Sequence, residues 1–203
     1  MSDNVYPKQR NKKGKTMSYD IRLKDPVTNE TLHSDMIHDM RGGTYAVGGT
    51  TELWLNITYN YAPYYYEATE NDERFAHDEP VSANDPTVQT EYGIRGIYGK
   101  TGAESIPMLK DLINRIEQKY KTPEGWLTGQ RERRKYFDKN NNEIDCITAI
   151  ETNQTNTEVI ETYTVSEGDT SNYWEETAAN AIKPLYQLIA MAQLRPDGVW
   201  DGD

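Results

Sequence analysis

The feature that most constrains the fold is an apolar stripe at helical spacing in the middle of the chain. Its members lie mostly three or four residues apart: Ile106, Leu109, Leu112, Ile113, Ile116 and Tyr120. This spacing places them on one face of an α-helix, and that face must be buried against a core. Thr101 and Glu104 have the spacing of a capping box, and Pro123 ends the segment. The stripe therefore predicts a core-facing helix over residues 104–120.

A second helix is predicted near the end of the sequence, over residues 174–194. Its apolar positions again lie on one side: Ala178, Ile182, Leu185, Leu188, Ile189 and Ala192. Pro184 lies inside this segment and has no N–H to donate, so the sequence predicts a break or kink there. Pro196 stops the helix, and a turn carrying Trp200 is expected after it.

Alternation of apolar and polar residues predicts strands elsewhere. Tyr19, Ile21 and Leu23 alternate before a turn at Asp25 and Pro26, which is typical of a hairpin. Residues 53–61 also alternate and predict a half-buried strand, although an amphipathic helix fits some of the same residues. Residues 131–167 contain two alternating runs around a polar turn, which predicts a β-meander.

Together these patterns predict an α+β fold with a mixed or antiparallel sheet, two main helices at about 104–120 and 174–194, and an inserted β-meander. We expect a single domain over residues 17–203, with excursions at 67–90 and 122–168. The first excursion is acidic and rich in Pro, Asn and Asp, so an exposed loop is expected there. Residues 1–16 lack periodic apolar positions and are expected to form a disordered leader.

The charge of the chain is uneven. The whole chain carries −11, whereas residues 1–16 hold five basic residues against Asp3, a net of +4. The remaining residues therefore carry −15, from 17 basic and 32 acidic side chains. A body this acidic repels a nucleic-acid backbone, so direct nucleic-acid binding by it is not expected.

The location of the protein is predicted from what the sequence lacks. No apolar run is long enough to cross a membrane, and the polar first residues have no signal-peptide core, so no membrane partner is expected. The chain holds a single cysteine, Cys146, so no disulfide forms within it. These features predict a cytoplasmic protein.

The stretch "GIRGIYGKTGAES", residues 93–105, is similar to a phosphate-binding loop but fails its spacing. A Walker A loop needs its first glycine five residues before Gly99, where this chain has Ile94. A glycine-rich turn before a helix N-terminus, with Lys100 beside it, still predicts an anion site, and a plain connection is the alternative. The candidate ligand-binding residues are Arg41, Gly42, Gly43, Tyr59, Tyr61, Arg95, Gly99, Lys100 and Thr101.

The sequence has no recognisable catalytic or metal-binding constellation. His33 and His38 lack the spacing of a zinc motif, and the polar run from Asp138 to Asn142 favours a hairpin turn over a calcium loop. We assign no catalytic residues, no metal ligands and no cofactor. Homo-oligomerisation stays open.

Four segments carry a resemblance: "RGGTYAVGG", "WLNITYNY", "YGKTGAESIP" and "RPDGVWDGD". They resemble blocks in small uncharacterised proteins of bacteriophages, prophages and other mobile elements. The resemblance implies a bacterial cytoplasm and an accessory or counter-defence role. It implies no activity and no catalytic residues.

Three classes of function follow from the sequence. The first is a non-enzymatic accessory binding protein that holds an anionic, nucleotide-like ligand or blocks a host bacterial protein. The second is an acidic mimic of nucleic acid that inhibits a host nuclease. The third is an enzyme of unrecognised type.

Overall fold

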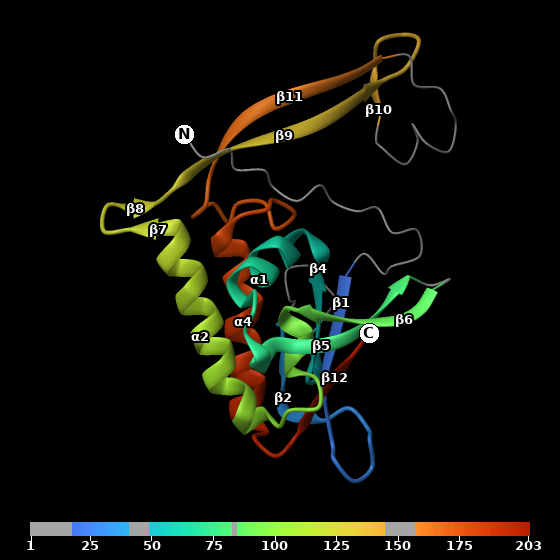
Figure 1. Ribbon diagram of the computed structural model, residues 1–203, viewed down its shortest axis with the longest axis vertical. Coiled ribbons are helices and arrows are strands. Elements are labelled where there is room, and N and C mark those ends of the chain that lie inside the picture. The colour runs from blue at the N-terminus through green and yellow to red at the C-terminus, as the bar shows by residue number, and fades with distance from the viewer. Residues whose placement is uncertain (1–17, 41–48, 83–84, 145–156) are drawn as a thin grey trace.

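The computed structural model describes residues 18–40, 49–82, 85–144 and 157–203 (Figure 1). Its elements in chain order are β1 (Ser18–Lys24), β2 (His33–His38), β3 (Thr50–Glu52), β4 (Trp54–Thr58), η1 (Tyr59–Tyr61), α1 (Ala62–Thr69), η2 (Glu73–Phe75), β5 (Ala76–Ser82), β6 (Asp85–Tyr92), η3 (Ile94–Ile97), α2 (Gly102–Tyr120), β7 (Lys121–Thr122), β8 (Gly125–Trp126), β9 (Thr128–Phe137), β10 (Glu143–Ile144), β11 (Thr157–Ser166), α4 (Ala178–Leu194) and β12 (Val199–Gly202). The predicted leader at 1–16 and Cys146 lie outside the described residues.

The central element is a three-stranded antiparallel sheet in the order β12-β1-β4. Ile21 of β1 lies opposite Leu55 of β4, and Leu23 of β1 lies opposite Trp200 of β12. All of these side chains are buried, while the residues between them on β1 are only partly buried. Because side chains alternate across a strand, one face of this sheet belongs to the core and the other does not.

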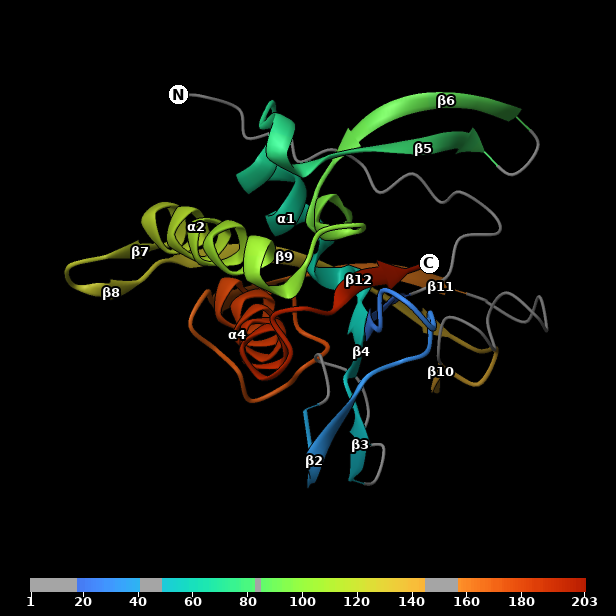
Figure 2. The same cartoon turned by 90° about the horizontal axis from the view of Figure 1, so that it is seen from below.

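The helices cover the buried face of the sheet. Figure 2 shows α2 and α4 side by side on the same side of β4 and β12. Leu109 and Leu112 of α2 and Leu185 and Leu188 of α4 are fully buried in the same apolar cluster as the inner face of the sheet. The two stripes recognised in the sequence therefore meet each other and the sheet in a common core.

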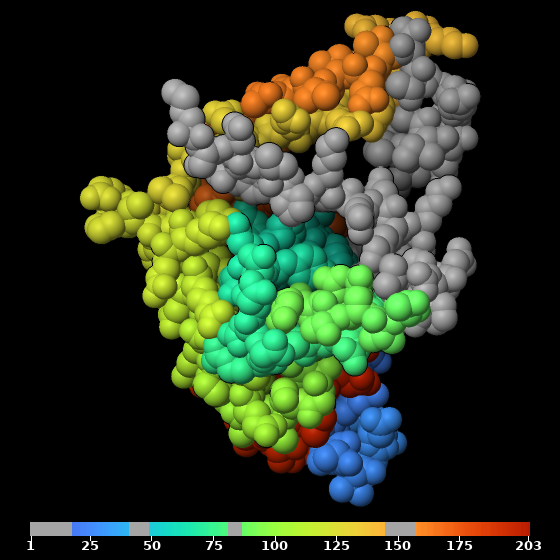
Figure 3. Space-filling view, viewed as in Figure 1, coloured from blue at the N-terminus to red at the C-terminus, as the bar shows by residue number. Residues whose placement is uncertain are grey.

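Hairpins project from this core. β5 and β6 pair with each other in a separate antiparallel sheet, and β9 pairs with both β10 and β11. The β9–β11 pairing runs in unbroken register from Ser166 opposite Thr128 to Thr157 opposite Phe137. Figure 3 shows this pair of strands standing away from the body, and we call it the arm.

The predicted α+β class is confirmed, with antiparallel pairing throughout the described strands. Both predicted helices are present, but their first residues differ. α2 begins at Gly102 because the capping box of Thr101 and Glu104 starts it there. α4 begins at Ala178 because Thr177 is its N-cap, so residues 174–177 precede the helix. The three-stranded β10-β9-β11 sheet lies where the meander was predicted.

The break predicted at Pro184 is not found, because α4 continues through this residue. The helix runs from Ala178 to Leu194 with Pro184 buried inside it. The missing N–H removes only the bond that would reach the carbonyl of Asn180, and burial of the apolar stripe outweighs that loss.

Three segments differ from their predictions. The strand expected over 53–61 covers only Trp54–Thr58, and the chain then enters η1 and α1. The loop expected within 67–90 contains most of the β5–β6 hairpin, with Pro80 in a strand that has one neighbour among the described strands. The turn expected after Pro196 continues into β12, which completes the central sheet.

Candidate functional site

The predicted anion site begins with the turn that leads from η3 into α2. Gly99 has a φ of 76°, and a Cβ there would meet nothing within 4 Å. The positive φ explains why glycine is favoured at this position. Lys100 follows it and is exposed. Gly99, Lys100 and Thr101 are consecutive in this turn.

The N–H groups at the start of α2 are already hydrogen-bonded within the chain. The Thr101 N–H donates to Glu104 Oε2 at 2.8 Å, and the Glu104 N–H donates to Thr101 Oγ1 at 3.2 Å. The Gly102 N–H donates to the Gly198 carbonyl at 2.8 Å, and the Ala103 N–H donates to the Pro196 carbonyl at 3.0 Å. An anion binds a helix N-terminus through free N–H groups, and these four are used.

Gly102 explains how the segment after α4 reaches those N–H groups. A Cβ on Gly102 would lie 2.7 Å from the Arg195 backbone oxygen. Only glycine therefore permits the end of α4 to approach the start of α2 so closely. The backbone carbonyls of Pro196 and Gly198 therefore accept from N–H groups that an anion was expected to use.

Arg95 lies on η3 and is buried beside two of the tyrosines of the core. Its guanidinium carbon lies 5.1 Å from the ring centre of Tyr19 and 5.5 Å from that of Tyr59. Arg95 Nε donates to the backbone oxygen of Asp203 at 2.8 Å, and Nη1 lies 3.3 Å from Glu79 Oε1. Arg95 and Tyr59 are therefore adjacent, but the positive charge of Arg95 is already paired.

The remaining predicted residues do not join this cluster. The hydroxyl of Tyr61 donates to the backbone carbonyl of Tyr173, which lies just before α4. Burial raises the pKa of Tyr61 and of Tyr59 above the ordinary value of a tyrosine, so both stay protonated at neutral pH. Arg41, Gly42 and Gly43 lie outside the described residues.

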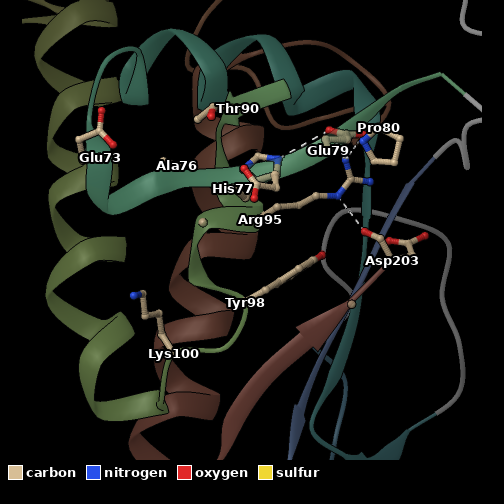
Figure 4. Close-up of a pocket in the computed structure, with 13 residues that line it drawn as sticks. Glu73, Ala76, His77, Glu79, Pro80, Thr90, Arg95, Tyr98, Lys100 and Asp203 are labelled. Carbon is tan, nitrogen blue, oxygen red and sulfur yellow. Dashed lines mark hydrogen bonds and ion pairs between the residues drawn. The ribbon is translucent and has the colours of Figure 1, made fainter. Parts of the chain in front are cut away.

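The cavity nearest to this region runs along β5, and we call it the β5 groove (Figure 4). It has a volume of about 890 Å³ and opens to solvent. Its lining residues are Glu73, Ala76, His77, Asp78, Glu79, Pro80, Thr90, Arg95, Gly96, Tyr98, Lys100, Gly202 and Asp203. η2, β5, β6, η3 and the end of β12 all contribute to it.

The β5 groove carries more negative than positive charge. Its carboxylates are Glu73, Asp78, Glu79 and Asp203, and its permanent cations are Arg95 and Lys100. Figure 4 shows Glu73 and Lys100 at one end, and at the other end Arg95 with its ion-pair partner Glu79 and its hydrogen-bond partner Asp203. The groove therefore favours a positively charged ligand over an anion.

Two polar atoms in the β5 groove are buried without a hydrogen-bond partner in the described chain, namely His77 Nε2 and the Tyr98 hydroxyl. His77 Nε2 lies 3.6 Å from Glu79 Oε2, which is an ion-pair distance but too long for a hydrogen bond. Burial raises the pKa of Tyr98, so its hydroxyl remains neutral. Buried polar atoms of this kind are ordinarily satisfied by water or a ligand, so the groove is a candidate binding site.

Sequence reasoning missed His77, Asp78, Glu79, Tyr98 and Asp203. The first three lie on β5, where charged residues and Pro80 hid the strand that positions them. The run Thr87, Val88 and Thr90 on β6 was the available signal, since β-branched residues favour strands and a neighbouring strand was needed to pair with them.

The comparisons with known proteins place the chain in no family. No family model matches it, and neither a curated protein nor a solved structure does so. Within the described ranges, no three His, Cys, Asp or Glu side chains form a cluster suited to a metal ion. None of the helices described is both long and apolar enough to span a membrane.

Proposed function

We propose that the chain is a non-enzymatic accessory binding protein that engages a partner protein through the β5 groove. The observation that carries this proposal is the use of the α2 N–H groups by the chain itself, together with the excess of carboxylates in the neighbouring groove. The first feature disfavours a nucleotide-like anion at the start of α2. The second supports a positively charged group, which the surface of a protein can supply.

The setting of the groove also supports a macromolecular partner. One wall is the β5–β6 hairpin, which belongs to a separate two-stranded sheet outside the central one. A partner can therefore contact the groove and the hairpin together. The bacterial context and the counter-defence role rest on the resemblance to proteins of phages and mobile elements, and we retain them as part of the proposal.

A photo-crosslinking amino acid at Thr90 tests the engagement. Thr90 is exposed and lines the groove, whereas Thr28 is another exposed threonine, in the turn after β1, and serves as the control site. In bacterial cells we expect a discrete crosslinked protein from Thr90 and none from Thr28. That protein, once identified and purified, should lose affinity for Thr90→Trp by about tenfold or more and keep its affinity for Thr28→Trp.

Calorimetry with linear and cyclic nucleotides tests the alternative, which is a nucleotide-like anion bound at the start of α2. We expect no binding, and no hydrolysis of ATP or GTP with magnesium. Binding that is abolished by Lys100→Ala would instead establish an anion site at the start of α2 and overturn the proposed function. Equal crosslinking from Thr90 and Thr28 would also count against it.

A further inference from the structure

The outer face of α4 carries no acidic side chain, although the chain as a whole is strongly acidic. The chain has 33 Asp and Glu residues and a net charge of −11, whereas α4 contains no carboxylate and a single cation, Lys183. Two large side chains on α4 are exposed, Tyr186 to 55% and Leu194 to 56%. Acidic molecules repel each other, so a contact between two copies of this chain is favoured at a surface without carboxylates, and this face provides one.

The exposed positions of α4 form one strip along the helix, centred on Ala190. The strip consists of Lys183, Tyr186, Gln187, Ala190, Gln193 and Leu194. With 3.6 residues per turn, all of them lie within about 60° of Ala190 around the helix axis. Tyr186 and Leu194 are four residues before and after Ala190, so a small side chain is flanked by a large one about 6 Å away in each direction. Figure 2 shows α4 at the periphery of the molecule.

The spacing of the strip is the same in both directions from Ala190, which is what a two-fold interface requires. In such an interface the same surface is used by both copies, and its centre meets itself. If two α4 helices lie antiparallel with Ala190 against Ala190, Tyr186 of one copy is level with Leu194 of the other. Gln187 is then level with Gln193. The small side chain at the centre allows the helices to approach to the separation of about 8–10 Å that is usual in helix packing.

The charges at the two ends of the strip are complementary in the same arrangement. Lys183 lies near the start of α4, whereas Asp197, with a side chain that is 60% exposed, lies in the turn after its end. The pKa of Arg195 is raised mainly by its hydrogen bond to Asp197, and the charges of Asp25 and Asp35 add to this effect, so these carboxylates also lie near the end of α4. In the antiparallel pair, Lys183 of each copy lies toward the acidic end of the other, where the helix dipole attracts it as well.

We propose that the protein forms a two-fold homodimer in which the outer faces of α4 pack antiparallel, with Ala190 at the axis. The residues of the strip are not among those that line the β5 groove, so the inference goes beyond the proposed function and does not depend on it. The strip extends over about 17 Å of helix, which makes the contact smaller than a standard interface. We therefore expect a reversible dimer with a Kd of about 10–100 µM.

Sedimentation equilibrium at protein concentrations below and above this Kd tests the inference. We expect the average mass to rise from that of one chain toward that of two. Ala190→Glu places two carboxylates against each other at the axis and should weaken the dimer by about a hundredfold or more. Gln118→Glu adds the same charge at an exposed position of α2 and should leave the dimer unchanged. Circular dichroism of each variant verifies its fold.

A disulfide tests the position of the axis without adding charge. In a Cys146→Ser background, Ala190→Cys should link two copies under mild oxidation, because the two-fold axis brings the introduced thiols within reach of each other. Gln118→Cys in the same background should remain a single chain.

The mass of a single chain at every concentration would overturn the inference. So would a dimer that Ala190→Glu leaves intact, or equal disulfide formation from Ala190→Cys and Gln118→Cys. A photo-crosslinking amino acid at Tyr186 that captures a different protein, and not a second copy, would assign the face to that protein and reject the dimer.

Discussion

At the scale of single residues, Glu167 holds together three elements that are distant in sequence. It is buried, and its Oε2 accepts from the Tyr64 hydroxyl of α1 at 2.7 Å and from the Ala178 N–H of α4 at 3.0 Å. Its Oε1 is paired with Arg131 of the arm. The neighbouring carboxylate raises the pKa of Tyr64, adding to the larger effect of burial, so the hydroxyl remains a donor. A buried charge with this many partners is costly to leave unpaired.

Replacing Glu167 with Gln should therefore destabilise the protein by about 3 kcal/mol, because it leaves the guanidinium of Arg131 without its counter-charge. Glu158→Gln removes a carboxylate from the exposed pair with Arg134 and should cost about 0.5 kcal/mol or less. Urea unfolding followed by circular dichroism measures both. Similar small losses in the two variants would mean that Glu167 contributes little beyond a surface pair.

At the scale of elements, α2 has sharply different faces. Leu109 and Leu112 are fully buried, whereas Lys110 and Asn114 are exposed. Leu109→Ala or Leu112→Ala should cost about 2–5 kcal/mol, since each removes buried methyl groups and leaves a cavity. Lys110→Ala and Asn114→Ala should change the unfolding free energy by less than about 0.5 kcal/mol. Thermal and urea unfolding measure these free energies. Equal losses of stability from substitutions on the two faces would contradict the packing of this helix.

The helices were predictable because each carries its own signal. The stripe of α2, its capping box and Pro123 all lie within one segment, and local periodicity needs no partner to be recognised. β1 was recognisable for the same reason, through Tyr19, Ile21 and Leu23. These elements make up most of the central core.

The elements that were missed depend on contacts that sequence periodicity does not show. β12 has one fully buried large side chain, Trp200, and is a strand because β1 pairs with it from the other end of the sequence. β5 is a strand because β6 pairs with it, not because its own residues alternate. The candidate site follows the same rule. Arg95, Gly99 and Lys100 were selected from local chemistry. That the carbonyls of Pro196 and Gly198 accept from the N–H groups of α2 could be seen only in the tertiary structure.

A cluster of salt bridges connects η2 to α2. Asp72 Oδ2 lies 2.6 Å from Arg74 Nη2 and 2.7 Å from Arg115 Nη2, and Asp111 Oδ2 lies 2.5 Å from Arg74 Nη2. Hydrogen bonding to Arg74 is the main reason that the pKa of Asp72 and of Asp111 is lowered from the usual value. The cluster holds the start of the β5–β6 hairpin against the helix.

This cluster gives the stability of the protein a defined pH dependence. A carboxylate with a lowered folded-state pKa adds stability above its unfolded pKa of about 3.9, and that stability is lost as the pH falls through the folded value. Unfolding free energies measured from neutral to acidic pH should therefore fall less steeply for Asp72→Asn than for the wild type. Glu70→Gln, an exposed carboxylate nearby with no ion pair in the described chain, should follow the wild-type slope. Parallel curves for all three proteins would exclude the cluster as a source of acid sensitivity.

At the scale of the whole molecule, the protein divides into a dense body and projecting hairpins. The apolar cluster unites residues from β1, β4, α1, α2, α4 and β12. Among the described residues of the arm, by contrast, only Val165 is buried, and it lies at the base. The arm therefore takes little part in the core, and its strands are held by their own pairing and by charge pairs between Arg133 and Glu161 and between Arg134 and Glu158.

The base of the arm differs from its outer part. The Glu167 N–H donates to the Leu127 carbonyl at 2.8 Å, so the two ends of the arm meet where it leaves the body. Arg131 reaches Glu167, and the Tyr163 hydroxyl donates to Glu175. Beyond these contacts, the outer part of the arm at residues 133–137 and 157–161 includes no buried side chain, and neither does β10.

Shortening the arm tests this division. Glu132 lies opposite Thr162, so residues 133–161 can be replaced by Asn-Gly, which closes an antiparallel pair with a two-residue turn. The melting temperature of the shortened protein should stay within a few degrees of the wild type, because the excision leaves the core and the Arg131–Glu167 pair in place. As a control, Arg131→Ala in the full-length protein should lower the melting temperature more than the excision does, since it leaves Glu167 buried without its cation. If the excision is the more damaging change, the outer arm is part of the folding unit, and the hairpins cannot be treated as appendages that are free to contact a partner.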